Sequence, residues 1–246
     1  MAPENAEKKD PNGKINEKTG LPLFDDDAEK AKAGKKGFVT VVIIHLIFTL
    51  LGVGIAYLIY KFGSTEDYDR AIKMWKGGKD ADYKWPWLAI IIYCYMVVFL
   101  NMWPVYFKEQ VMRGGNLRAN QFLLRTAVGN QDEVSAVVLY EDGDKGLYNR
   151  ANRSIYHFLE NGLPLVVCMP GSFLIFPFPA FVVVTCYAIG RILYQLGYTL
   201  KGFGAHTPGF FIDRFATFTL IGFHILTFIF MTFPMEDEEN KPPKPN

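Results

Sequence analysis

Three ionisable side chains stand at helical spacing in a largely apolar segment. Arg153, His157 and Glu160 occupy positions i, i+4 and i+7, so an α-helix would place them on one face. A guanidinium can hold a carboxylate through two parallel hydrogen bonds, and a carboxylate such as that of Glu160 can accept from an ammonium group. This stripe therefore has the chemistry to bind a small zwitterionic or anionic ligand.

A second stripe follows in the next apolar segment, where Arg191, Tyr194 and Tyr198 stand at i, i+3 and i+7. It adds another cation and two phenols, which can contact a thiol or an oxyanion. Ionisable groups inside membrane spans are costly, so both stripes should face a partner helix or a wet cavity. Two interpretations stay open: a ligand pocket, or a buried structural network in which Arg191 pairs with Glu160 across the turn between the two segments.

The elements that carry these stripes are predicted membrane spans. Half of the 246 residues are hydrophobic, and the charged residues are segregated into blocks between long apolar runs. A spanning helix needs about 20 predominantly apolar residues. Five segments meet this requirement, so we expect an all-α integral membrane protein with spans at about 38–60, 86–107, 148–176, 180–200 and 215–233.

The segments between the spans are polar. Residues 1–36 and the acidic, Pro-rich end of the chain have the composition of solvated tails, and residues 61–85 that of a charged loop. Between the third and fourth spans, Pro177 and Pro179 predict a tight helical hairpin, because proline interrupts a continuing helix.

Composition also excludes several classes of protein. The formal net charge of +1 provides no field that would attract nucleic acid. The three cysteines all lie in apolar runs and have neither CxxC partners nor a nearby His at metal spacing, so we expect no metal site and no disulfide framework. The polar first 36 residues resemble neither a secretory signal nor a mitochondrial transit peptide.

Localisation and orientation follow from the spans and from the basic residues. An organelle membrane, mitochondrial or of the endoplasmic reticulum, is expected. With five spans, the N-terminal tail, residues 108–153 and residues 201–214 share one side, which holds about twice as many Lys and Arg as the other. The positive-inside rule then predicts that the N-terminal tail faces the cytosol or the matrix.

Both stripes are part of runs that resemble a known family. The run Arg153-Ser-Ile-Tyr-His157-Phe-Leu-Glu160-Asn161-Gly-Leu-Pro164 resembles the RAxxNxxExxxP signature of the MAPEG family, the membrane-associated proteins of eicosanoid and glutathione metabolism. The run Gly190-Arg191-Ile-Leu-Tyr194-Gln-Leu-Gly197-Tyr198 is similar to the R-x-L-Y-x-x-G-Y helix of its branch with microsomal glutathione transferase 3 and leukotriene C4 synthase. The resemblance covers roughly residues 86–233.

The resemblance implies a four-helix membrane bundle that forms a homotrimer, with glutathione as cofactor between neighbouring subunits. Residues 1–36 would then be a polar tail, 37–62 an additional transmembrane helix, 86–233 the MAPEG-like domain and 234–246 a second tail. Carried over by position, the implied glutathione contacts are Arg153, Glu160, Arg191, Tyr194 and Tyr198, with His157 at the place of the family's Asn.

Departures from the family leave the function open between two classes. His157 stands where the signature has Asn, and Ser154 stands where it has Ala. No Arg follows Tyr198 within fifteen residues, although the family's thiolate-stabilising Arg is expected there. One hypothesis is a glutathione transferase or peroxidase acting on lipophilic substrates, with its catalytic residues unassigned. The alternative is a catalytically degenerate accessory subunit of a large membrane assembly, such as a mitochondrial respiratory complex. Lipids and either other copies or other subunits are the expected partners.

Overall fold

The computed structural model describes residues 9–10, 13–14, 23–76, 83–112, 122–128 and 135–233. Within them, five helices are long and apolar enough to cross a membrane, which confirms the prediction of a mostly helical integral membrane protein. These helices are α1 (Asp27–Phe62), α3 (Lys84–Val111), α4 (Gly143–Ile175), α5 (Pro177–Lys201) and α6 (Thr207–Thr232). The expected C-terminal tail, 234–246, and most of the first 22 residues lie outside the described part of the chain.

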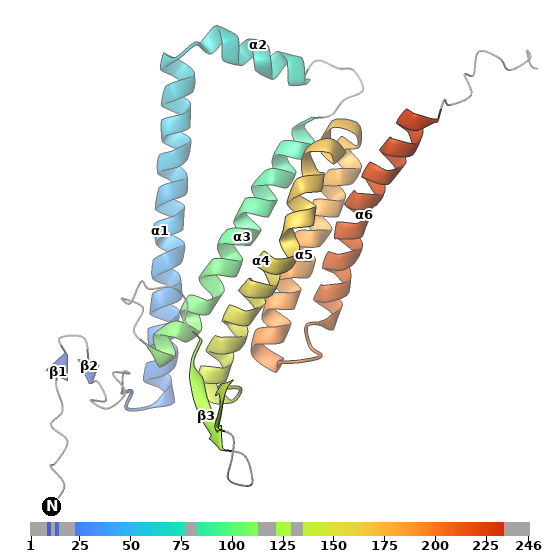
Figure 1. The fold of residues 1–246 in the computed structure, drawn as a ribbon. Helices are drawn as coiled ribbons and strands as arrows, with labels where there is room; N and C mark the ends of the chain where they lie inside the picture. Colours follow the sequence, from blue (N-terminus) through green and yellow to red (C-terminus); the bar gives the residue numbers. More distant parts are fainter. Residues whose placement is uncertain are drawn as a thin grey trace, which may run out of the picture.

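Helices α3 to α6 form a bundle around one apolar core (Figure 1). Each of the four helices contributes fully buried side chains to it, among them Leu100 of α3, Leu165 of α4, Val184 of α5 and Leu220 of α6. Large apolar side chains also cover the outside of these helices, for example Leu163, which is the arrangement expected where lipid replaces water. The bundle therefore holds the two polar stripes between apolar surfaces.

The turn between α4 and α5 is shorter than the sequence predicts. Helix α4 ends at Ile175, Phe176 links the two helices, and Pro177 and Pro179 lie in the first turn of α5. Proline is tolerated there because the first N–H groups of a helix have no intrahelical acceptor. The prolines thus begin α5 instead of forming a separate turn.

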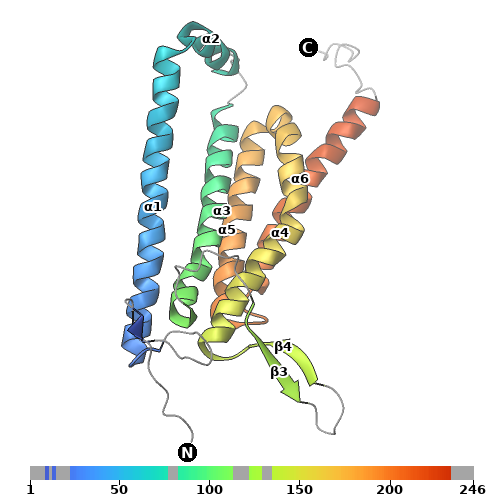
Figure 2. The ribbon, with the colours of Figure 1, turned by 60° about the vertical axis from the view of Figure 1, so that its left-hand side comes forward.

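Helix α1 lies on the flank of α3 (Figures 1 and 2). It begins at Asp27, inside the segment expected to be a polar tail, because the side chain of Asp26 caps it by accepting from the Glu29 N–H at 2.7 Å. Its one buried residue is Gly34, in its first half, which lies against Tyr106 and Gln110 of α3. Farther along, the Tyr95 hydroxyl of α3 donates to that of Thr49 at 3.2 Å. Along the most apolar 18-residue stretch of α1, no residue is buried.

In the described residues, one helix and four short strands outside the spans were not predicted. Helix α2 (Thr65–Lys76) occupies the expected charged loop and runs across the end of α1 (Figure 1). Strands β3 (Leu124–Val128) and β4 (Ser135–Leu139) pair antiparallel in the polar segment before α4, and β1 (Lys9–Asp10) pairs with β2 (Gly13–Lys14). Short amphipathic segments like these carry a weaker signal than a 20-residue apolar run.

The connections lie at two opposite ends of the bundle. The start of α1, the β3–β4 hairpin and the turn between α5 and α6 gather at one end, whereas α2 and the α4–α5 junction lie at the other (Figures 1 and 2). This distribution is the one that five successive crossings require. Which end faces the cytosol or matrix stays a prediction.

Candidate functional site

The site begins with the early start of α6. The sequence predicts a loop over residues 201–214 and a fifth span from 215, but α6 starts at Thr207, with Pro208 in its first turn. Asp213 and Arg214 are therefore helical and enter the bundle. Both were missed as site residues. Their signal was the 3.6-residue spacing that continues from Asp213 to the buried Thr217 and Leu220.

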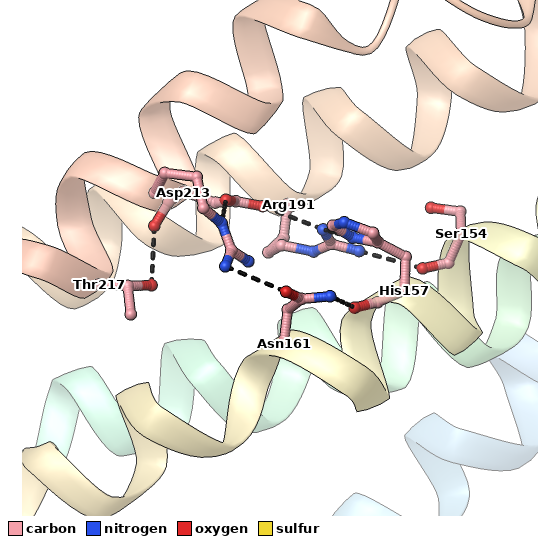
Figure 3. A network of polar contacts seen from close by, with 7 residues as sticks. Ser154, His157, Asn161, Arg191, Asp213 and Thr217 are labelled. Carbon is pink, nitrogen blue, oxygen red and sulfur yellow. Dashed lines mark hydrogen bonds and ion pairs between the residues drawn. The ribbon is translucent and has the colours of Figure 1, made fainter.

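Arg191 of α5 is the centre of a buried polar network (Figure 3). Its Nη1 lies 3.0 Å from Oδ2 of Asp213, and neither side chain is exposed. The same nitrogen lies 3.1 Å from Nδ1 of His157, and Nη2 donates to the backbone carbonyl of Ser154 at 3.1 Å. The predicted pairing of Arg191 with Glu160 is wrong, because α6 supplies the carboxylate.

The contact with Arg191 determines the protonation state of His157. A guanidinium nitrogen can only donate, so Nδ1 of His157 accepts and carries no proton. The neutral imidazole stacks on the ring of Tyr194, with centroids 4.7 Å apart and an angle of 11° between the planes. The Cζ atom of Arg191 lies 4.4 Å from the same Tyr194 centroid. Predicted residues from both stripes, His157, Arg191 and Tyr194, thus form one cluster.

A second guanidinium shares the Asp213 carboxylate. Nε of Arg214 donates to Oδ1 of Asp213 at 2.8 Å, and its Nη1 donates to Oδ1 of Asn161 at 3.3 Å. The Asn161 amide in turn donates to the carbonyl of His157 at 2.9 Å. The hydroxyl of Thr217 donates to the Asp213 carbonyl (Figure 3). One carboxylate therefore joins α5 and α6 and, through these bonds, α4.

Arg153 and Glu160 lie on a different surface from this network. They form an ion pair of 3.1 Å with each other, and their side chains are 47% and 52% exposed. Both point away from the bundle core, although His157 lies between them in the sequence. The first stripe is thus divided: its central residue turns inward, and its two charged ends remain on the outer face of α4.

Tyr198 lies at the edge of the cluster. Its ring centroid is 6.1 Å from that of Tyr194 and 5.5 Å from that of His206, in the turn before α6. Tyr198 is partly buried, so it borders both the inner network and the surface. His206 thus lies against both tyrosines.

The cluster carries an excess of positive charge. Among the described residues, Arg191 and Arg214 share the single carboxylate of Asp213 and His157 is neutral, whereas Arg153 is balanced by Glu160. An uncompensated charge is costly in or near a membrane. An anionic group near the guanidinium of Arg214, which is 20% exposed, would balance it.

In the described part of the chain, no group of three or more His, Cys, Asp or Glu residues could hold a metal ion. The donors of Arg191 are largely occupied by the protein, so the residues open to a ligand are Arg153, Glu160 and Tyr198. No protein-family model, curated protein or solved structure matches the chain. The resemblance of its two motifs to a glutathione-binding family therefore stays a prediction.

Proposed function

We propose that this membrane protein binds glutathione on the outer face of α4, beside the end of α5, as the MAPEG-like motifs predict. The observation that carries the proposal is the Arg153–Glu160 ion pair, which is half exposed on a membrane-spanning helix. Charged groups of a membrane-spanning helix rarely face lipid and are usually covered by protein or lie in a wet cavity. A ligand, held together with a neighbouring copy of the chain, would cover this pair.

The depth of Arg153 and Glu160 in the membrane suits a site where a water-soluble ligand meets a lipophilic substrate. Helix α4 has 33 residues, so it is about 50 Å long, whereas the hydrocarbon core of a bilayer is about 30 Å thick. The first turns of α4 therefore extend past the hydrocarbon. Arg153 lies in this region and Glu160 two turns deeper, which lets a water-soluble ligand enter from the aqueous side.

The charges of Arg153 and Glu160 complement those of glutathione. Glutathione carries two carboxylates and one ammonium group, which complement Arg153 and Glu160 respectively. Of the three guanidiniums, that of Arg153 is the most exposed, so it is proposed to hold a carboxylate of glutathione and to leave the thiol available for attack on a lipophilic electrophile or peroxide. Arg191 is assigned a positioning role, because it holds His157 and Tyr194 inside the bundle.

Calorimetric titration of glutathione into the purified full-length protein in nanodiscs tests the proposal. Arg153→Gln and Glu160→Gln should each raise Kd by at least about tenfold, which corresponds to about 1.4 kcal/mol. The matched control is Arg70→Gln, which removes an exposed helical ion pair with Asp67 on α2 and should leave Kd unchanged. Absence of glutathione binding by the unmutated protein, or equal effects of all three variants, would overturn the proposal.

One observation favours the alternative of an accessory subunit. The apolar stretch of α1 is unburied, and a Cβ added at Gly52 or Gly54 would meet nothing within 4 Å. This leaves a long helical face free for other subunits. Native gels of mildly solubilised membranes should then show the protein only in a large assembly. Migration of the native protein alone, at the mass of a trimer, would contradict this alternative.

A further inference from the structure

A second polar region lies between α4 and α5, nearer the end of the bundle that carries the β3–β4 hairpin (Figure 1). Tyr148 and Asn152 stand one turn apart on α4, and Gln195 and Thr199 stand one turn apart on α5. All four side chains are completely buried. We call these four residues the polar seam. None of them belongs to the proposed glutathione site.

Two hydrogen bonds fix the register of the helices along the polar seam. The Gln195 amide donates to the backbone carbonyl of Ala151 at 3.1 Å, and Nε of Arg150 donates to the carbonyl of Thr199 at 3.0 Å. These bonds place Gln195 beside the turn that carries Asn152. They also hold the Gln195 side chain in one orientation, because its amide nitrogen is anchored.

The remaining polar atoms of the seam make no well-formed hydrogen bond to any other group in the described part of the chain. They are Oη of Tyr148, both amide atoms of Asn152, Oε1 of Gln195 and Oγ1 of Thr199. Of these groups, only the side chains of Tyr148 and Asn152 interact with each other. A buried donor or acceptor without a partner is expensive, and native proteins satisfy nearly all of them. So many unsatisfied neutral groups in one layer indicate a polar ligand that both donates and accepts.

Unpartnered buried atoms also occur beside the charged network. Within the described residues, the Ser154 hydroxyl on α4 is buried without a partner, and so is Nε of Arg191. The Ser154 carbonyl already accepts from Arg191. Buried polar groups that lack partners are therefore found both in the seam and next to the ion pair of Arg191 with Asp213.

We propose that the polar seam binds a row of water molecules that reaches the Arg191–Asp213 ion pair. Water fits because it is small, uncharged and both donor and acceptor, and buried waters typically bond to several otherwise unsatisfied protein groups. Through these waters the ion pair keeps part of its hydration inside the membrane, which reduces the desolvation penalty of burying charge. The row also offers protons a hydrogen-bonded route to Asp213 from the hairpin end.

X-ray hydroxyl radical footprinting of the full-length protein in nanodiscs tests this proposal. Radiolysis generates radicals from bound water in place, so a buried residue beside water is oxidised even when a scavenger removes radicals from bulk solvent. Tyr148 should be oxidised under scavenger, whereas the equally buried Leu100, Leu165 and Leu220 should be protected, each relative to its rate in denatured protein. Protection of Tyr148 equal to that of these leucines would overturn the proposal.

A double variant of the seam, compared with a single control variant, provides a second test. Asn152→Leu combined with Gln195→Leu removes two of the four water-binding side chains of the seam and should lower Tyr148 oxidation several-fold. Ser172→Ala, which removes a buried and unpartnered hydroxyl elsewhere on α4, should leave it unchanged. Unchanged oxidation in the double variant would count against the water row. If the double variant fails to fold, the comparison of Tyr148 with the leucines in the unmutated protein still decides.

Discussion

The Asp213 carboxylate on α6 lies 3.0 Å from the Arg191 guanidinium on α5, and both side chains are fully buried. Asp213 also binds Arg214 through its other oxygen, so one carboxylate compensates two guanidiniums. The network is asymmetric: loss of either arginine leaves Asp213 with a cation, whereas loss of the carboxylate leaves two cations without a counter-charge.

This asymmetry predicts unequal costs of substitution. Asp213→Asn should lower the free energy of unfolding by about 3–5 kcal/mol, because it leaves Arg191 buried without a counter-charge. Arg191→Met, which keeps the volume and leaves Asp213 paired with Arg214, should cost less. Denaturation in detergent micelles measures both. Asp67→Asn, in an exposed pair on α2, should cost about 0–1 kcal/mol and is the control. A larger loss for Arg191→Met than for Asp213→Asn would contradict the asymmetry.

The close approach of α5 and α6 predicts a steric requirement at Gly190. A Cβ there would lie 2.8 Å from the backbone nitrogen of Asp213 and 3.0 Å from the Gly209 carbonyl oxygen. Backbone atoms cannot rotate away, so Gly190→Ala should destabilise the protein by about 1–3 kcal/mol. Gly222→Ala on α6 meets nothing within 4 Å and should be neutral or stabilising by about 0.5–1 kcal/mol. Thermal denaturation of the two variants, side by side, checks this difference in sign.

Asn149 is predicted to hold the β3–β4 hairpin on α4. Its side chain is 2% exposed and makes three hydrogen bonds of 2.8–2.9 Å, two with the backbone of Leu123 and one to the Tyr140 carbonyl. Asn149→Ala removes all three, so amide hydrogen exchange in β3 and β4 should accelerate while the core helices stay protected. Asn101→Ala, which removes only a bond within α3, should not change exchange in the hairpin.

Helix α2 is predicted to lie on the membrane surface. Tyr68 and Ile72 share one face, Glu66 and Arg70 the opposite one, and such a two-sided helix suits the boundary between lipid and water. A fluorophore on Ile72→Cys should therefore be quenched by lipid-attached spin labels in vesicles. The same fluorophore on Glu66→Cys should be quenched by a water-soluble agent instead. Equal quenching at the two positions by both agents would show that α2 does not lie in the interface.

Some of the site could be predicted because its signals are local. Apolar runs of sufficient length identify spans without any knowledge of packing, and helical spacing places His157 on one face with Arg153 and Glu160. The start of α6 was wrong by eight residues because Asp213 and Arg214 interrupt the apolar run, and charge was interpreted as loop. Their burial depends on Arg191, which lies 22 residues away from Asp213.

The sequence by itself determined the five spans and the two polar stripes, since span length and residue spacing are properties of a chain segment alone. The tertiary structure decided which stripe residue faces inward and which carboxylate meets Arg191. Both depend on how α4, α5 and α6 are rotated against one another, and this rotation is set by side-chain packing between distant segments. Glu160 and Asp213 are equally plausible partners by chemistry. Only the packing of α6 on α5 buries Asp213 against Arg191 and leaves Glu160 outside with Arg153.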